Sequence, residues 1–263
     1  MSASAGPLVE MRGIIKAFGA VQALAGADLE LRAGEVLGLV GDNAAGKSTL
    51  MKVLTGVHRP DAGEILFEGR RVGFHSPRDS RALGIEMIYQ NLALAPNLDV
   101  VANVFLGREV TRAALPHAVE WLDERRMESE TRALLERLRI NIDSVRRPVE
   151  RLSGGQQQAV AIARAVAFQA RVVIMDEPTA SLAVKEVGKV LDLVMQLRAK
   201  GVSVILISHR LQDIFTVADR VMVLRGGQPV AVRRIGETTM DEIVKHIVGA
   251  AEASGVSHLA SGR

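Results

Sequence analysis

A glycine-rich segment between an apolar run and a helical pattern constrains this chain more than any other feature. The segment consists of Gly41, Asp42, Asn43, Ala44, Ala45, Gly46, Lys47, Ser48 and Thr49. It matches the pattern G-x-x-x-x-G-K-[ST]. The preceding run Val36–Val40 is typical of a buried strand, and a helical pattern begins near Lys47. A strand, a tight turn and a helix in this order predict a layered α/β domain.

The residues of this loop are suited to binding phosphate. Backbone N–H groups that turn inward form an anion nest, and the helix N-terminus adds a positive field. Lys47 can reach the β- and γ-phosphates of a nucleotide, and the Ser48 hydroxyl can ligate Mg²⁺. We therefore predict ATP and Mg²⁺ as ligands. Ala44 stands where many such loops have glycine, and its Cβ would strain a backbone with positive φ; we expect nucleotide binding to survive this departure.

The composition is that of an ordinary globular protein. The 263 residues are 48% apolar and 24% charged, and they suffice for one large α/β domain or two small ones. The net charge of +3 gives no reason to expect a nucleic-acid partner. No cysteine is present, which excludes disulfides and thiolate metal sites and suits the cytosol. The start of the chain does not resemble a secretory signal, and no apolar run approaches the ~20 residues that span a bilayer.

Strand-like and helical patterns alternate along most of the chain. Further buried strands are predicted at Ile85–Ile88, Val172–Met175, Val202–Ile207 and Val221–Leu224. Looser alternation predicts a small antiparallel sheet built from Val9–Ile15, Ala27–Leu31 and Glu64–Phe67. From about Leu98 to Phe168 the pattern is mostly helical, which predicts a helical subdomain inserted between strands. We expect one domain over residues 8–250, with the helical subdomain at about 91–168 and flexible ends at 1–7 and 251–263.

Two carboxylates follow one of the buried strands. The run Val172–Met175 leads into Asp176 and Glu177, which would lie at the C-terminal edge of a parallel strand, where ligands bind in such sheets. Asp176 would hold Mg²⁺ through water, and Glu177 would polarise an attacking water as general base. Because Pro178 follows, solvated acids before a turn are the alternative, but the phosphate loop makes that alternative unattractive.

A second anion site is predicted at Leu152-Ser153-Gly154-Gly155-Gln156-Gln157-Gln158, directly before a helical stretch. Ser153 and the two glycines Gly154 and Gly155 expose backbone N–H groups at a helix N-terminus, so a phosphate could approach closely. The segment resembles the signature of ABC-type ATPases. In that family two cassettes pack head-to-tail, and the signature of one closes on the γ-phosphate held by the other. A helix cap without a ligand is the alternative.

The resemblance extends over nearly the whole chain and implies further roles. It implies an α/β fold with a P-loop NTPase core, a small antiparallel β subdomain and an inserted helical subdomain. Gln90 stands where the family has a glutamine that touches Mg²⁺ or the lytic water, and His209 matches the histidine that contacts the γ-phosphate. Phe18 falls where an aromatic ring stacks on adenine, although an ordinary core Phe is the alternative. Ala183 replaces an Asp that helps to couple the two sites, either as a subfamily trait or with weaker cooperativity.

The region Met87–Glu109 resembles the corresponding part of simple-sugar importers, and the single cassette resembles their shorter, fructose-type members. The resemblance implies a subunit that binds and hydrolyses ATP to drive sugar import. The expected partners are a second copy of the chain, a transmembrane sugar permease docked on the apolar segment after Gln90 and, indirectly, a periplasmic sugar-binding protein. The expected location is the cytoplasmic face of the bacterial inner membrane, as a peripheral subunit.

Several other classes of nucleotide-binding protein fit less well. A GTPase or small kinase would share the phosphate loop, but the chain has no Asn-Lys-x-Asp motif, and neither class needs the signature. A chromosome-maintenance ATPase would need long heptad arms. The remaining alternatives are a cassette that serves a non-sugar substrate and one with weak or regulatory ATPase activity, suggested by Ala44 and Ala183.

Overall fold

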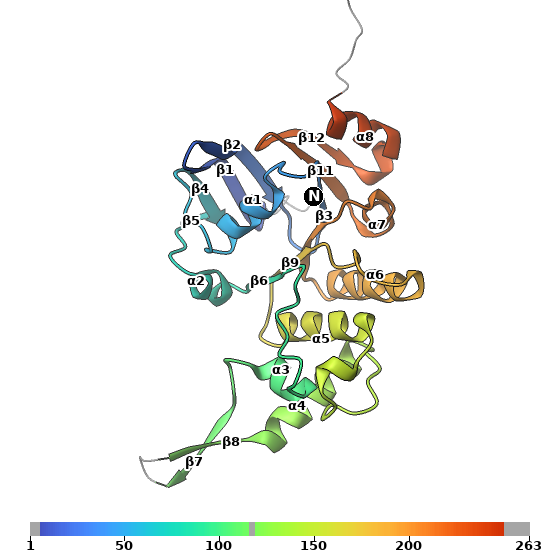
Figure 1. Ribbon diagram of the computed structural model, residues 1–263. Coiled ribbons are helices and arrows are strands. Elements are labelled where there is room, and N and C mark those ends of the chain that lie inside the picture. Colours follow the sequence, from blue (N-terminus) through green and yellow to red (C-terminus); the bar gives the residue numbers. More distant parts are fainter. Residues whose placement is uncertain (1–5, 116–118, 250–263) are drawn as a thin grey trace, which may run out of the picture.

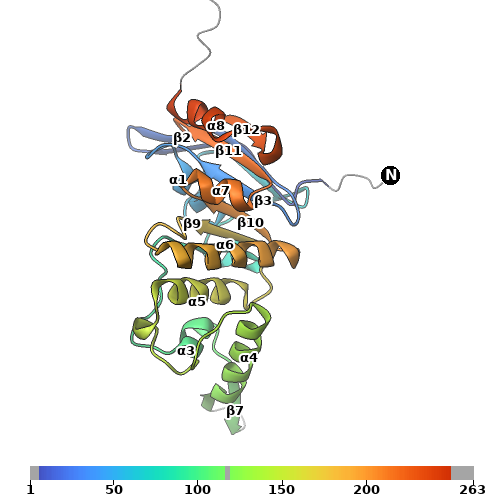
Figure 2. The same cartoon turned by 90° about the vertical axis from the view of Figure 1, so that its right-hand side faces the viewer.

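The computed structural model describes residues 6–115 and 119–249. The flexible tail predicted at 251–263 lies outside the described residues, as do residues 1–5 of the predicted flexible segment 1–7. Within the described ranges, no helix is both long enough and apolar enough to cross a membrane. Figures 1 and 2 show two sheets in the upper part of the molecule and a group of helices below them.

A six-stranded sheet forms the centre of the fold, in the order β12-β11-β3-β10-β9-β6. All neighbouring strands are parallel except β11 and β12. The strands are β3 (Val36–Val40), β6 (Ile85–Ile88), β9 (Val172–Asp176), β10 (Ser203–Ile207), β11 (Arg220–Arg225) and β12 (Gln228–Arg234). The continuous apolar runs of the sequence thus become strands covered on both faces, which confirms the predicted α/β class.

The predicted antiparallel sheet is also present, in the order β2-β1-β4-β5. Its strands are β1 (Val9–Phe18), β2 (Val21–Leu31), β4 (Ala62–Phe67) and β5 (Arg70–Val72). Helix α1 (Lys47–Leu54) packs between this sheet and β3. The alternation along β3 divides the core, because Leu37 and Leu39 face the antiparallel sheet while Val36 and Val40 face the other core, which extends to the helices.

Helices cover the other face of the central sheet. The helices besides α1 are α2 (Pro77–Ala82), α3 (Val100–Phe105), α4 (Glu124–Arg137), α5 (Gly154–Val166), α6 (Val184–Ala199), α7 (Leu211–Val217) and α8 (Met240–Val248), with short 3-10 turns at Val149–Arg151 and Ile235–Glu237. Of these, α5, α6, α7 and α8 contribute buried residues to the core on this face of the sheet. Helix α5 is the centre of the lower part, since it packs against α3 on one side and α6 on the other. Its consecutive residues Val160–Ala163 are all fully buried, so this part of the helix is enclosed on nearly every side.

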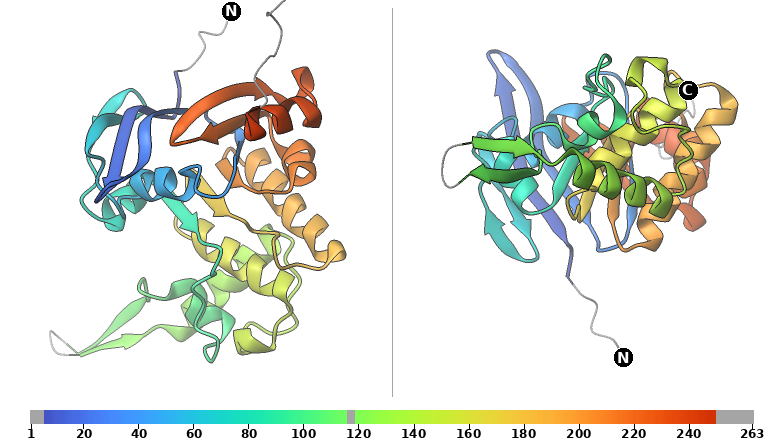
Figure 3. Two further views of the ribbon diagram at one scale, coloured as in Figure 1. Left: turned by 45° about the horizontal axis from the view of Figure 1, so that its top comes forward. Right: turned by 90° about the horizontal axis from the view of Figure 1, so that it is seen from below.

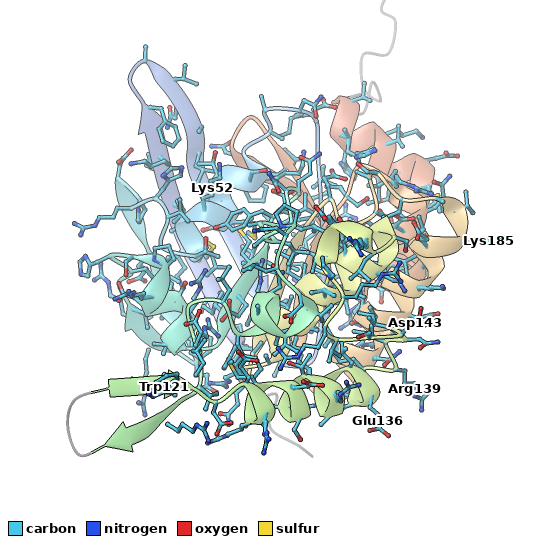
Figure 4. All side chains as sticks on the ribbon, turned by 60° about the horizontal axis from the view of Figure 1, so that its bottom comes forward. Lys52, Trp121, Glu136, Arg139, Asp143 and Lys185 are labelled. Atoms are coloured by element: carbon cyan, nitrogen blue, oxygen red, sulfur yellow. The ribbon has the colours of Figure 1, made fainter. Side chains whose placement is uncertain are left out.

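A β-hairpin interrupts the region that the sequence predicts to be mostly helical. It pairs β7 (Thr111–Leu115) with β8 (Val119–Leu122) and with no other described strand. The hairpin projects from the helices in every view (Figures 1 and 3), and Figure 4 places Trp121 on it. A two-stranded ribbon has no buried face to impose a clear period, so the sequence gives little warning of it.

Candidate nucleotide site

The two glycines that define the loop occupy positions that no other residue can fill. Gly41 has φ +149°, and a Cβ there would lie 2.1 Å from the carbonyl oxygen of Leu224. Gly46 has φ +99°, and its Cβ would lie 2.6 Å from the carbonyl oxygen of Ala23. Both contacts are far inside van der Waals distance. The loop therefore takes its shape from neighbouring backbone on β11 and β2.

The turn at Gly226-Gly227, which the sequence analysis did not identify, supports the phosphate loop through backbone hydrogen bonds. The N–H of Gly227 donates to the carbonyl of Ala45 at 3.0 Å, and the N–H of Ala25 donates to the carbonyl of Gly227 at 3.0 Å. Gly227 has φ +74° and no room for a Cβ. The Gly226-Gly227 pair between β11 and β12 was the available signal, because a double glycine marks a tight turn.

The backbone at Ala44 has φ +64°, as the sequence analysis anticipated for this position. A left-handed conformation costs a residue with a Cβ roughly 1–2 kcal/mol. Its neighbour Ala45 is buried and has no such conformation.

Replacing Ala44 with glycine should raise the thermal midpoint of the nucleotide-free protein. Glycine relieves the strain of the left-handed conformation, and this effect is larger than the cost of the additional conformational freedom of glycine in the unfolded chain. The free energy of unfolding should therefore rise by about 0.5–1 kcal/mol. Differential scanning calorimetry measures the shift. Ala45→Gly is the matched control and should lower the midpoint, because it removes a buried methyl group without relieving strain. A lower midpoint for Ala44→Gly would show that the conformation is not strained.

Lys47 lies at the first position of α1 and reaches back over the loop. Its Nζ donates to the carbonyls of Gly41 at 2.7 Å and Asp42 at 2.8 Å. Burial lowers the pKa of Lys47, and nearby carboxylates, led by Glu177, oppose that shift. The N-cap of α1, Gly46, has no side chain to satisfy the N–H groups of the first turn. The Lys47 ammonium group and the N–H groups of the first turn of α1 thus lie at the same loop, which suits the binding of a phosphate.

Asp176 ends β9 beside the loop. The Ser48 hydroxyl donates to its Oδ2 at 3.2 Å. Burial raises the pKa of Asp176, while this hydrogen bond and the Lys47 charge act against the rise. A divalent cation would offset the cost of the buried carboxylate. The described residues hold no cluster of three or more His, Cys, Asp or Glu side chains for a metal. One hydroxyl and one carboxylate fit Mg²⁺, which completes its shell with water and substrate phosphates.

Glu177 and His209 form a pair at the ends of two adjacent strands. The His209 Nδ1 lies 2.7 Å from Oε2 of Glu177, and the backbone N–H of His209 donates to the same oxygen at 3.4 Å. Glu177 has φ +52°, and its N–H donates to the carbonyl of Ile207 at 3.0 Å. Strained backbone of this kind concentrates at functional sites. When Glu177 is ionised, Nδ1 carries the hydrogen, so the imidazole holds the carboxylate in place.

Two further predicted residues lie at the margin of this site. Phe18 ends β1 and is 44% exposed, and His58 meets its ring edge-on with centroids 5.1 Å apart. It is therefore not an ordinary core Phe and has a free surface for stacking. Gln90 is exposed just after β6. No hydrogen bond within the described residues joins Gln90 to Ser48 or Asp176.

Ser153 caps α5, away from the phosphate loop. Its hydroxyl accepts from the N–H of Gln156 at 3.3 Å, and the Gln156 side chain accepts from the N–H of Ser153 at 3.1 Å. This reciprocal capping box fixes the start of the helix. Gly154 is exposed and Gly155 is half-buried. Helix α5 and helix α1 stay well separated in Figures 1 and 2, with β9 and α6 between them.

The structure thus brings the predicted phosphate, metal and general-base residues together, while the predicted anion site at the start of α5 lies apart from them. The loop, Lys47 and the N-terminus of α1 can hold a chain of phosphates, and Ser48 with Asp176 can hold Mg²⁺ beside them. Glu177 with His209 can accept a proton from water at the same edge of the sheet. The helix N-terminus at Ser153 offers anion donors, and the Glu186 carboxylate of the same chain already faces them, because hydrogen bonds from Ser153 and from the Gly155 N–H lower the pKa of Glu186.

Comparison with known proteins agrees with this geometry. The family model described as ABC transporter matches residues 24–180. The xylose/arabinose import ATP-binding protein XylG of Sulfolobus acidocaldarius is 48% identical, over 90% of this chain and 92% of that protein. The fructose import ATP-binding protein FrcA of Rhizobium meliloti is 45% identical, over 94% and 95% respectively. The ribose import ATP-binding protein RbsA of Chromobacterium violaceum is 47% identical over 92% of this chain, which spans about half (47%) of that protein.

Solved structures give the same result. A crystal structure of an ATP-binding cassette of an ABC transporter in its ADP conformation superposes with a TM-score of 0.79 at 28% identity, covering 92% of this chain and 99% of that one. A nucleotide-free cassette from an ABC transporter superposes with a TM-score of 0.76 at 27% identity, covering 92% and 95%. The predicted resemblance is confirmed, and this chain belongs to the ABC transporter family as one of its ATP-binding cassettes.

Proposed function

We propose that this chain is the ATP-hydrolysing subunit of an importer for a simple sugar. Three relatives that match at least 90% of it are named for import of xylose and arabinose, of fructose and of ribose. The observation that carries the hydrolytic part is the Glu177–His209 pair beside the phosphate loop. The cargo part rests on those relatives, because the sugar itself would not touch this subunit.

The site is proposed to act on ATP as follows. Phe18 stacks on adenine, and the loop with Lys47 holds the β- and γ-phosphates. Mg²⁺, held by Ser48 and through water by Asp176, would neutralise charge on those phosphates. Glu177 takes a proton from the attacking water while His209 keeps its carboxylate oriented. Gln90 would touch the metal or the lytic water.

A second copy of the chain completes the site in this proposal. Ser153, Gly154 and Gly155 lie at the start of α5, which stays apart from the phosphate loop of its own chain. Head-to-tail pairing would bring them to the γ-phosphate on the other copy. Two ATP molecules would then lie between the chains, and their hydrolysis would let the pair separate.

The segment after Gln90 is the proposed permease contact. Leu92 and Leu94 are only partly buried against the core. Asn103, which is fully buried, accepts from the N–H of Ala95 at 2.7 Å and donates to the carbonyl of Ala95 at 3.0 Å, so the segment is anchored to α3. The subunit would therefore sit on the cytoplasmic face of the bacterial inner membrane, and a periplasmic sugar-binding protein would act on the far side of the permease.

Reconstitution tests this function. The chain and its cognate permease are placed in proteoliposomes that enclose ATP, and a binding protein loaded with ribose, xylose or fructose is added outside. We expect one of these sugars to enter only when ATP is present and to raise the rate of ATP hydrolysis. Hydrolysis that ignores every loaded binding protein, with no sugar uptake, would contradict sugar import.

A further inference from the structure

A buried hydrogen bond joins the segment after Glu177 to the helix after His209. The Thr179 hydroxyl donates to Oδ2 of Asp213 at 2.5 Å. Both residues are buried, since only 1% of Thr179 and 3% of Asp213 is exposed. Thr179 lies two residues after Glu177, and Asp213 lies four residues after His209, on α7. The bond therefore connects the two segments that carry the proposed general base and its partner.

This bond acts beyond the end of the strand ladder. The register of β9 and β10 ends at the pair Asp176 and Ile207. Glu177 follows directly, and its φ of +52° is strained for a residue with a side chain. Strained backbone persists only where the surrounding structure over-determines it. The hydrogen bond from Thr179 to Asp213 is one such constraint, because it fixes the chain just after Glu177.

Helix α7 gives this hydrogen bond a firm support. The helix packs against β3 and α6, and its residues Ile214 and Val217 are buried in the core. Asp213 directly precedes Ile214, so its carboxylate takes a fixed position relative to the central sheet. The Thr179 hydroxyl is thereby held against an element that the core keeps in place.

Keeping a polar pair in the interior costs free energy. A buried carboxylate loses hydration, and apolar side chains in place of a buried polar pair are often neutral or stabilising. Arg210 offsets part of this cost, since its Nε lies 3.7 Å from Oδ2 of Asp213. A negative charge in the first turn of α7 also favours the helix. Neither effect needs the hydroxyl of Thr179, which belongs to the turn after Glu177.

We propose that Thr179 and Asp213 are positioning residues that hold the Glu177 carboxylate in the orientation that ATP hydrolysis requires. This inference rests on the proposed function and adds two residues to it. The contacts form a closed ring. It runs from Glu177 to Thr179, across to Asp213, back to His209, and across to Glu177 again. Such a ring leaves the carboxylate few other positions, and a displacement of about 1 Å can lower a rate 10²-fold.

The experiment measures ATP hydrolysis and ATP binding by the full chain with Mg²⁺. Thr179→Val removes the hydroxyl at nearly constant volume, and Thr179→Ser keeps it. The matched control is Thr131→Val, since Thr131 is a fully buried residue of α4 whose hydroxyl donates to the carbonyl of Met127. We expect Thr179→Val to lower kcat by about 10- to 100-fold at unchanged ATP affinity. Thr179→Ser should recover most of the rate, and Thr131→Val should match the unchanged chain.

A second variant separates positioning from stability, because Thr179→Val leaves a buried carboxylate without its hydroxyl partner. Thr179→Val combined with Asp213→Leu replaces the pair with apolar side chains of similar shape, which restores packing but not the hydrogen bond. This double variant should melt close to the unchanged chain and still show the lowered kcat. All rates are expressed per molecule of bound ATP, so unfolded protein does not contribute.

A third comparison tests whether the effect passes through Glu177. In a Glu177→Gln background, Thr179→Val should cause no further loss, because the carboxylate that it positions is already gone. A further tenfold loss in that background would overturn the proposal. So would a kcat for Thr179→Val equal to that of Thr131→Val, or a loss of ATP affinity at unchanged kcat. If the unchanged chain hydrolyses no ATP, or if Glu177→Gln hydrolyses it equally fast, the proposed function fails instead.

Discussion

Glu177→Gln is expected to lower the rate of ATP hydrolysis by about 10²–10⁴-fold while ATP still binds. The Glu177 carboxylate is held by a second side chain, because His209 Nδ1 lies 2.7 Å from its Oε2. Glutamine keeps the shape and can still hydrogen-bond, but it cannot take a proton from water. Phosphate release at saturating ATP measures the rate, and equilibrium binding of labelled ATP checks the affinity.

The control for this change is Glu136→Gln, which neutralises an exposed carboxylate on α4 outside the site. Its rate should equal that of the unchanged chain. A Glu177→Gln variant that turns over ATP as quickly as the control would remove Glu177 from the mechanism and leave the general base unassigned.

Lys47→Ala is expected to weaken ATP binding by about 10- to 100-fold, because charged hydrogen bonds to a ligand contribute about 1.5–3 kcal/mol. In the free protein this ammonium group is held over the loop by two carbonyls, so it is already positioned for phosphate. Titration calorimetry with ATP and Mg²⁺ gives the affinity directly.

Lys52→Ala is the matched control, since Lys52 lies on the same helix α1 five residues further on, and Figure 4 marks it there. It should leave the affinity nearly unchanged. If Lys47→Ala melts normally and binds ATP as tightly as Lys52→Ala, the assignment of the phosphate site is wrong.

The sequence was most informative where short-range pattern and chemistry agree. The run Val172–Met175 is uniformly apolar because β9 is buried on both faces, and its two carboxylates mark where the strand leaves the sheet. The loop pattern was equally reliable, since Gly41 and Gly46 are fixed by backbone contacts that no side chain tolerates.

Contacts between distant segments were beyond the reach of the sequence. Nothing in the spacing indicates that Gly227 supports Ala45, or that Arg164 donates to the carbonyls of Leu92 and Ala93, 72 and 71 residues earlier in the chain. The hairpin of β7 and β8 was missed for a different reason, because it packs against no other described strand and carries no clear hydrophobic period. The nucleotide site therefore combines a local motif that the sequence predicts with contacts from distant segments that it does not predict.

The most direct test of the account is the mass of the Glu177→Gln variant in solution, measured by light scattering with Mg²⁺ and either ATP or ADP. We predict twice the mass of a single chain with ATP and the mass of a single chain with ADP. Adding Ser153→Arg, which fills the anion site at the start of α5, should keep the variant monomeric with ATP. A single-chain mass for Glu177→Gln with ATP bound, or pairing that survives Ser153→Arg, would contradict a nucleotide site shared between two copies.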